Sequence, residues 1–337
     1  MSRPRHLDGE LVTARRGFFW AGGEPFAVSE GTALRGQMFV QWEAPAEVTK
    51  PYPVVLIHGG GGQGTDWLGT PDGRPGWATF LLHEGYAVYV VDRPGHGRSP
   101  YHPDVLGPPG GVFTLELVTT LFTDAANGPA AHPTAHLHTQ WPGSGDLNDR
   151  YVRAFAAGTG PMLGDCRLAH ALEQACGAAL LDEIGPAILI TASAGSPMGW
   201  LTADARPRSV KAIVAVEPVG PAFMDNPAIG LSLDWGLTAA PLTFDPPAAS
   251  PEELRSKTAR RLPALAQLPI ALVEAEASLF AEPGPATAAY LEQAGCHVQR
   301  IMLAEQGVHG NGHLVMMERN NREALEPVLR WLDAAVT

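Results

Sequence analysis

Short apolar runs and longer stretches with helical periodicity alternate along the chain. Runs of about four to eight apolar or β-branched residues, bounded by glycine, proline or polar clusters, are typical of strands buried on both faces of a parallel sheet. Such runs predict strands at 53–57, 86–91, 187–190, 210–216, 268–273 and 297–303. Two earlier runs, at 17–20 and 37–42, are alternating or short and are separated by glycines, which favours antiparallel strands at a sheet edge.

Segments with helical character lie between the predicted strands. They predict helices at 77–83, 166–181, 197–205 and 286–294, a weaker one at 113–122 and a small one at 251–261. A final helix carries an apolar face suited to docking on a sheet, made of Leu325, Val328, Leu329 and Leu332. Strand, helix and strand at this spacing form parallel βαβ units, so we predict an α/β fold with a mostly parallel central sheet flanked by helices.

Two loop-rich segments interrupt this alternation. Residues at about 100–180 are rich in proline, glycine and histidine, and residues at about 219–265 contain several prolines and aspartates. No internal repeat or low-complexity linker divides the chain. We therefore predict one domain over 1–337, in which the two insertions form a cap that covers the functional site.

A tight turn after the predicted strand at 187–190 is the first candidate for chemistry. A nucleophile elbow, G-x-S-x-G, needs small residues two positions before and two after the nucleophile, because the turn is strained. Thr191 and Gly195 flank Ser193 in this way, although a β-branched residue limits how tightly the turn closes. Ser196 is the weaker candidate because Met198 would crowd its turn, so Ser193 is the predicted nucleophile.

Four consecutive glycines, Gly59 to Gly62, follow the predicted strand at 53–57. Glycines let backbone N–H groups approach a ligand without interference from a Cβ atom, which an oxyanion hole built from peptide donors requires. We expect the oxyanion hole to use Gly60, Gly61 and Ala194, without fixing which loop glycine donates.

An acid and a histidine follow the elbow in the chain. Glu217 and Glu276 lie at or just after the ends of predicted strands, and His309 and His313 share a late loop. A serine hydroxyl needs an imidazole to take its proton and a carboxylate to orient that imidazole. The order Ser, Glu, His is that of α/β-hydrolases, but the residues alone leave both the glutamate and the histidine open.

Composition narrows the class of protein. The chain has 337 residues, of which 45% are hydrophobic, enough for a large core. Its net charge of −12, without a basic cluster, argues against nucleic-acid binding. The cysteines Cys166, Cys176 and Cys296 have no metal-site spacing, and a Cys166–Cys176 bridge has no support in the sequence.

No cofactor or metal is expected. His132, His136 and His138 lie close together, but no carboxylate stands at ligand spacing beside them. No stretch approaches the roughly 18 apolar residues of a membrane span, and 1–16 carries no apolar core of a signal peptide. We therefore expect a cytoplasmic protein that does not act on membranes, unless a longer precursor is exported.

Several motifs, in one order and spacing, resemble a small group of microbial α/β-hydrolase esterases. They are His58-Gly59, Thr70-Pro71-Asp72-Gly73-Arg74 with Gly76-Trp77, Gly95-x-Gly97-Arg98-Ser99, Val216-Glu217-Pro218, and Gly307-Val308-His309-Gly310-Asn311-x-His313 with Asn320-Asn321. The resemblance covers the chain from about residue 10 onward and is weak through both insertions.

This resemblance implies a Ser/Glu/His triad whose glutamate follows the strand after the elbow. It selects Glu217 over Glu276 and His313 over His309, and it implies a homodimer. Two departures stand out: Ala192 occupies a position that is commonly histidine in the family, and Gly60 and Gly61 replace a vicinal cysteine pair of the oxyanion loop.

We therefore expect a serine esterase acting on a small-molecule ester through an acyl-enzyme on Ser193. The alternatives are a lactonase, amidase or acyltransferase on the same scaffold, or a binding protein without catalysis, because fold does not fix the reaction. Trp141, Phe155, Met162 and Trp235 are candidates for an apolar substrate wall or for ordinary core.

Overall fold

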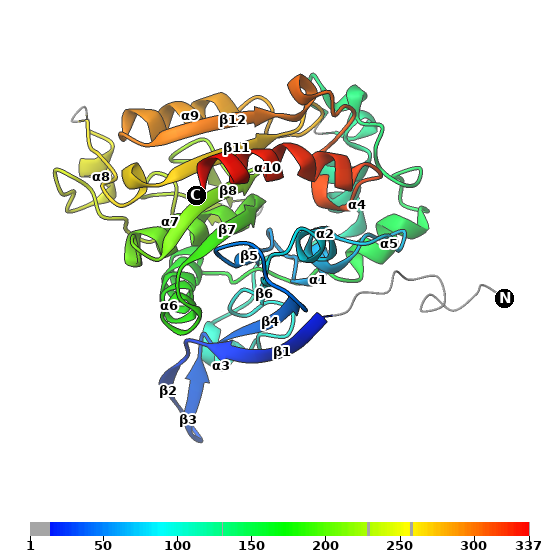
Figure 1. Cartoon of the computed structure of the whole chain (residues 1–337). Helices are drawn as coiled ribbons and strands as arrows, with labels where there is room; N and C mark the ends of the chain where they lie inside the picture. Colours follow the sequence, from blue (N-terminus) through cyan, green and yellow to red (C-terminus); the bar gives the residue numbers. More distant parts are fainter. Residues whose placement is uncertain (1–13, 130, 228–229, 257–258, 337) are drawn as a thin grey trace.

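The computed structural model describes residues 14–129, 131–227, 230–256 and 259–336 (Figure 1). Its centre is an eight-stranded sheet in the order β1-β4-β6-β5-β7-β8-β11-β12. β4 is antiparallel to both of its neighbours, β1 and β6, whereas the strands from β6 to β12 run parallel to one another. The predicted α/β fold with a mostly parallel sheet and an antiparallel edge is confirmed.

The strands of this sheet match the predicted apolar runs closely. Their bounds are β1 Ala14–Ala21, β4 Met38–Pro45, β5 Val54–Ile57, β6 Val88–Asp92, β7 Ala187–Ala192, β8 Val210–Val216, β11 Pro269–Glu274 and β12 His297–Met302. Two short pairs lie outside it: β2 Glu24–Val28 with β3 Gly31–Arg35, and β9 Asp225–Asn226 with β10 Leu231–Ser232.

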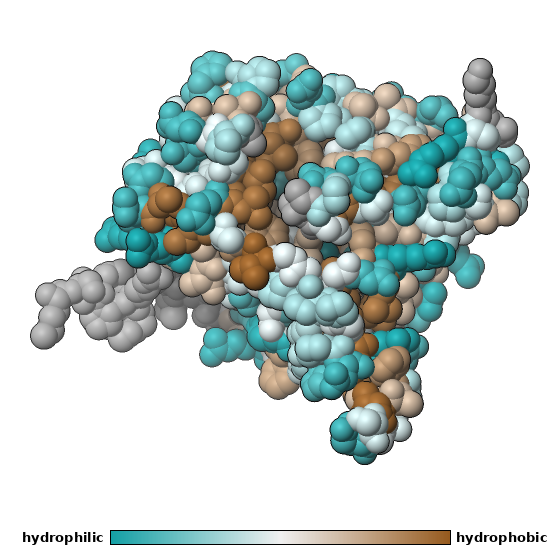
Figure 2. All heavy atoms as spheres, turned by 180° about the vertical axis from the view of Figure 1, so that it is seen from behind, coloured by the Kyte–Doolittle hydropathy of each residue, from teal (hydrophilic) through white to brown (hydrophobic). Residues whose placement is uncertain are grey.

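The hairpin of β2 and β3 projects from the sheet edge (Figure 1). The sequence indicated strands in this region but not a separate two-stranded arm. The arm carries apolar side chains on its surface (Figure 2), and Leu34 in β3 is 60% exposed. Isolated apolar residues on a surface are common, so this arm by itself indicates no ligand.

Ten α-helical segments surround the sheet within the described residues. Their bounds are α1 Thr65–Leu68, α2 Trp77–His83, α3 Pro103–Leu106, α4 Leu115–Val118, α5 Arg150–Ala156, α6 Cys166–Ile184, α7 Ser196–Ala205, α8 Pro251–Leu254, α9 Gly284–Gln293 and α10 Asn321–Ala335. The helices predicted at 77–83, 166–181, 197–205 and 286–294 are confirmed to within a few residues.

Successive residues of the parallel strands pack on opposite faces of the sheet. In β7, Leu189 joins a core with side chains of α6, α7 and α9, whereas Ile188 and Ile190 join a core with side chains of α2 and α10. The strands are therefore buried on both sides, which explains why they read as unbroken apolar runs. Trp77 Nε1 donates to the Asn321 carbonyl at 2.8 Å and ties α2 to α10.

Two predicted helices differ from the structure. The segment at 113–122 forms α4 and then widens into a π-helical turn at Thr119–Thr123. The helix predicted at 251–261 stops at Leu254. Arg261 instead exchanges two backbone hydrogen bonds with Asp245, so the chain there is extended and cannot continue a helix.

All three cysteines are free thiols. Cys176 Sγ donates to the Gly36 carbonyl at 2.7 Å, so its thiol serves the contact between α6 and the edge of the sheet. Across the described ranges, none of the helices is both long and apolar enough to cross a membrane.

The contact between α6 and α7 depends on a glycine. A Cβ atom at Gly177 of α6 would lie 1.9 Å from Thr202 Oγ1 of α7. We expect Gly177→Ala to lower the free energy of unfolding by about 1–3 kcal/mol through overpacking, although alanine favours helix over glycine by about 1 kcal/mol. Urea unfolding measures the change. Adding Thr202→Ala should restore most of the loss, and a Gly177→Ala variant as stable as wild type would contradict this packing.

Candidate active site

The carboxyl ends of β5, β7, β8 and β11 meet at one edge of the sheet. Ile57 lies beside Thr191, Ala192 beside Val216, and Val216 beside Val273 in register. The segments that follow these strands therefore converge, as ligand-binding loops do at this edge of open α/β sheets.

Ser193 follows β7 with φ of 49°, in the left-handed region that a serine rarely adopts. The turn closes against the loop after β5, since a Cβ atom at Gly195 would lie 2.3 Å from the His58 carbonyl oxygen. Thr191 fits because its Cγ2 faces Gly199, where a Cβ atom would be only 2.8 Å away. Ser196 is buried, and its hydroxyl donates to the Ser193 carbonyl at 2.8 Å.

Glu217 follows β8, also with a left-handed φ, of 51°. Its carboxylate accepts a hydrogen bond from the Ala275 backbone N–H at 2.6 Å and another from the Ser278 hydroxyl. Burial raises the pKa of Glu217, and His313 is the strongest influence that opposes this rise. The Ala275 backbone and the Ser278 hydroxyl thus hold the Glu217 carboxylate in place, and its Oε2 faces His313.

His313 lies beside Glu217 in the folded chain. Its Nδ1 is 3.4 Å from Glu217 Oε2 and 3.5 Å from Ser278 Oγ. The ring stacks on Phe122, with centroids 5.3 Å apart, and also contacts Phe280. A carboxylate at Nδ1 favours the tautomer with the proton on that nitrogen, which leaves Nε2 free to accept a proton.

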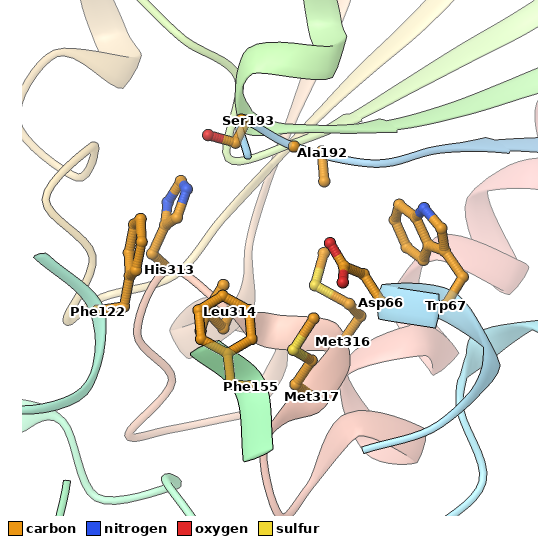
Figure 3. Close-up of a pocket in the computed structure, with 12 residues that line it drawn as sticks. Asp66, Trp67, Phe122, Phe155, Ala192, Ser193, His313, Leu314, Met316 and Met317 are labelled. Carbon is orange, nitrogen blue, oxygen red and sulfur yellow. The ribbon is translucent and has the colours of Figure 1, made fainter. Parts of the chain in front are cut away.

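Ser193 and His313 line the same cavity, and Figure 3 shows both side chains facing it. The structure thus brings together the three residues that the resemblance selected. Glu276 and His309 form a separate pair, with His309 Nδ1 3.3 Å from Glu276 Oε1. The His309 side chain is 65% exposed, against 4% for His313, so this second pair lies at the surface.

The glycine loop after β5 packs directly against the elbow. A Cβ atom at Gly59 would lie 3.2 Å from Ser193 Cβ, and one at Gly60 would lie 3.2 Å from Ala194 Cβ. Gly60 lines the cavity with Ser193, whereas Gly61 has φ of 63° and its carbonyl accepts from the Gly160 N–H. The absence of side chains at Gly59 and Gly60 therefore permits the close approach expected of a peptide oxyanion hole.

Arg93, just after β6, ties the loop to the elbow from behind. Its guanidinium donates to the Gly59 carbonyl at 2.7 Å, to the Ala194 carbonyl at 3.1 Å and to Glu173 at 2.6 Å. Both charged side chains are buried, and burial raises the pKa of Glu173 while Arg93 opposes the rise. One cation thus fixes the orientation of two peptide groups that border the cavity.

The cavity has two compartments on either side of Ser193. The larger, about 170 Å³, is mostly apolar and is lined chiefly by Phe113, Leu121, Phe122, Met162, Val219 and Phe280. The smaller, about 30 Å³, is bordered by Asp66, Trp67, Phe155, Met316 and Met317. Of the candidate wall residues, Met162 and Phe155 line these compartments, whereas Trp141 and Trp235 belong to the packed core.

The loop that carries His313 is anchored by Glu318. This buried carboxylate accepts hydrogen bonds from the Gly312 N–H at 2.9 Å and from Asn311 Nδ2 at 2.8 Å, and it pairs with His138 Nε2 at 2.7 Å. His138 belongs to the first insertion, so this network fastens that insertion to the loop.

The motif at 70–74 supports the same loop. The Arg74 guanidinium donates to the Glu318 carbonyl at 3.0 Å and to the Arg319 carbonyl at 2.8 Å. Asp72 pairs with Arg74 at 2.7 Å and holds it in place. The motif therefore acts through the position of the histidine loop, and its arginine does not reach the reacting groups.

Sequence reasoning missed the roles of Ser278, Glu318 and Arg93, and it considered His138 only as a metal ligand. Arg93 stands directly after a buried strand, and this position could have marked it as a candidate, as the same position marked Glu217. Nothing in the sequence pairs Glu318 with His138, which lie 180 residues apart and meet only in the fold.

Comparisons with known proteins show the family of the chain. A model of the α/β-hydrolase fold matches residues 52–293, and the chain belongs to this family. It is 39% identical over 351 residues to the probable secreted lipase phiG of Fungal sp. (strain ATCC 74256), across 98% of this chain and 92% of the relative. The resemblance to microbial α/β-hydrolase esterases is therefore confirmed at the level of the family.

A solved structure shares the fold. A novel bacterial esterase superposes with a TM-score of 0.70 at 24% identity, over 98% of each chain. A cold-adapted esterase from an Arctic intertidal metagenomic library is more distant, with a TM-score of 0.44 at 15% identity, over 98% of this chain and 97% of that one.

The expectation of a cytoplasmic protein is wrong, because the relative that matches nearly the whole chain is named as a secreted lipase. The expectation rested on 1–16, which carries no apolar core of a signal peptide, and the acidic composition suits an extracellular protein as well as an intracellular one.

The Glu318 network makes a measurable prediction. We expect Glu318→Gln to lower kcat about 10- to 100-fold with a smaller effect on KM, because a displaced His313 loop weakens proton transfer more than substrate contact. Steady-state kinetics on a short p-nitrophenyl ester measure both constants. Glu276→Gln is the matched control at the surface pair, and equal, small effects of the two variants would contradict the anchoring role.

Proposed function

We propose that this protein is a serine esterase in which Ser193, His313 and Glu217 form the catalytic triad. The observation that carries the proposal is the shared cavity of Ser193 and His313 together with the pairing of His313 Nδ1 with buried Glu217. A hydroxyl, an imidazole and a carboxylate in this relation can activate the hydroxyl as a nucleophile.

In the proposed reaction, His313 Nε2 takes the proton of Ser193 as Oγ attacks the ester carbonyl carbon. The C–O bond to the alcohol then breaks, and His313 gives its proton to the departing alkoxide, which leaves the acyl group on Ser193. Water attacks the acyl-enzyme with His313 again as base, and the carboxylic acid is released. Glu217 stabilises the imidazolium in both steps without itself taking the proton.

The oxyanion of each tetrahedral intermediate needs fixed N–H donors. We assign this role to the backbone N–H groups of Gly60 and Ala194, since both residues border the cavity and pack against each other. Gly61 is the alternative loop donor. Arg93 supports the Gly60 part of this assignment, because its hydrogen bond to the Gly59 carbonyl fixes the peptide plane that carries the Gly60 N–H. Its bond to the Ala194 carbonyl holds the next peptide of the elbow.

The size of the apolar compartment bounds the substrate. An apolar cavity of about 150 Å³ holds one benzene molecule, and the larger compartment has about 170 Å³. A short or medium acyl chain, or one ring, fits this space without rearrangement. Its walls come from both insertions, which supports their proposed role as a cap.

The kinship with a secreted lipase leads us to infer that this esterase also acts outside the cell. The homodimer that the family resemblance implies stays a prediction.

Removal of the nucleophile is the first test. Ser193→Ala should lower kcat for p-nitrophenyl butyrate by about 10³-fold or more, because no other group in the proposal can form the acyl-enzyme. The rate of p-nitrophenolate release measures the loss. Ser29→Ala, on the exposed hairpin, should retain the wild-type rate. A Ser193→Ala enzyme with the wild-type rate would refute the proposed function.

The choice of glutamate has its own test. Glu217→Gln should lower kcat by about 10²- to 10⁴-fold, because a neutral amide cannot stabilise the imidazolium and can favour the wrong tautomer. Glu276→Gln should lower it less than about fivefold, since its partner His309 lies at the surface. Comparison of kcat at matched thermal stability decides the point, and the opposite ranking would transfer the role to Glu276.

A further inference from the structure

Asp66 in α1 places a carboxyl group at the cavity, and the proposed triad gives it no role. It borders the small compartment beside Ser193 and also an outer hollow of about 370 Å³, which it shares with Thr65 and Thr70. Figure 3 shows Asp66 and His313 on opposite sides of the pocket, with Ser193 at the end of β7 between them. A substrate group that passes from Ser193 to the outer hollow must therefore pass Asp66.

The walls around this carboxyl group are mostly apolar. Trp67, Phe155, Met316 and Met317 border the same compartment, and the short side chain of Ala192 leaves the space in front of Asp66 open (Figure 3). Removal from bulk water raises the pKa of Asp66 to about 7, and the charge of nearby Asp92 adds to the rise. A Gln63 backbone hydrogen bond and the charge of Arg93 oppose it.

The backbone beside Asp66 is arranged to admit the carboxyl group. A Cβ atom at Gly62 would lie 2.1 Å from Asp66 Oδ2, so a side chain at position 62 would displace the carboxyl from its place. Gly60 thus leaves room for the reacting groups beside Ser193, whereas Gly62 leaves room for the carboxyl group of Asp66. A polar group set into an apolar wall costs free energy unless a partner satisfies it.

We propose that Asp66 is a specificity-determining residue that hydrogen-bonds a hydroxyl group of the substrate, so that the preferred substrates are hydroxylated esters. This inference rests on the proposed esterase function and narrows it. The apolar part of the ester occupies the larger compartment, and the hydroxylated part extends from Ser193 past Asp66 toward the outer hollow.

A hydroxyl group fits this position better than a charged group. It can donate to a carboxylate and accept from a carboxylic acid, so it pairs with Asp66 in either protonation state. An ammonium group would have to lose its hydration among the apolar walls. The hydroxyl carries no such charge, and the pairing gives the carboxyl a second partner on its cavity side, beside the Gln63 backbone hydrogen bond.

Isosteric ester pairs test the inference without assuming which side of the ester faces Asp66. On the acyl side, p-nitrophenyl β-hydroxybutyrate is compared with p-nitrophenyl isovalerate. On the alcohol side, hydroxyethyl butyrate is compared with propyl butyrate. In each pair a hydroxyl replaces a methyl group, and the ratio of the two kcat/KM values cancels losses that affect both esters.

We expect wild type to favour the hydroxylated ester in one of the two pairs, and Asp66→Leu to lower that ratio about tenfold or more. Asp66→Asn, which keeps hydrogen-bonding groups, should lower this ratio less, and thermal melts check that both variants fold.

Ratios unchanged by Asp66→Leu in both pairs would overturn the inference, as would a stronger dependence on Asp66 for dimethylaminoethyl butyrate. If wild type hydrolysed none of these esters, the proposed function itself would fail, which is a distinct result.

Discussion

The left-handed backbone at Ser193 is the constraint on which the rest of the site depends. A non-glycine residue in such a conformation costs about 1–3 kcal/mol, and surrounding packing must hold it there. Here the turn closes against the loop after β5, where Gly195 meets the His58 carbonyl, and Gly199 leaves room for Thr191. Glu217 repeats the conformation at the end of the neighbouring strand. Parallel strands thus present a hydroxyl and a carboxylate at one edge.

A buried ion pair and a buried hydrogen-bond network hold the loops around this edge. Arg93 and Glu173 orient the peptides beside the cavity, and Glu318 with His138 fixes the loop that carries His313. Breaking a buried ion pair such as Arg93 with Glu173 by removing one partner costs about 3–5 kcal/mol, because a charge is left uncompensated. Such contacts hold these loops in one arrangement. The proton relay of the proposed triad needs this fixed arrangement.

The sequence predicted the parts of the structure that depend on local pattern. The apolar runs predicted the strands, and Ser193 was placed by the small residues around it. Long-range contacts could not be predicted: Arg261 forms backbone hydrogen bonds with Asp245 where a helix was expected, and Glu318 meets His138 across the fold. In the sequence, the β-branched Thr191 raised a doubt about how tightly the turn can close. The structure removes this doubt, because Thr191 Cγ2 faces Gly199, which has no side chain. Asp66 gave no sequence signal, because a lone acidic residue in a first helical turn is common.

The central claim is that Ser193 faces its histidine and two peptide donors in one preorganised site. A crystal structure of the protein after reaction with diethyl fluorophosphate, which loses fluoride to a nucleophilic serine, tests it most directly. The account predicts phosphorus bonded to Ser193 Oγ, with the phosphoryl oxygen within hydrogen-bond distance of the Gly60 and Ala194 N–H groups and His313 Nε2 beside Oγ. An adduct on another residue, or a phosphoryl oxygen turned away from both N–H groups, would contradict it.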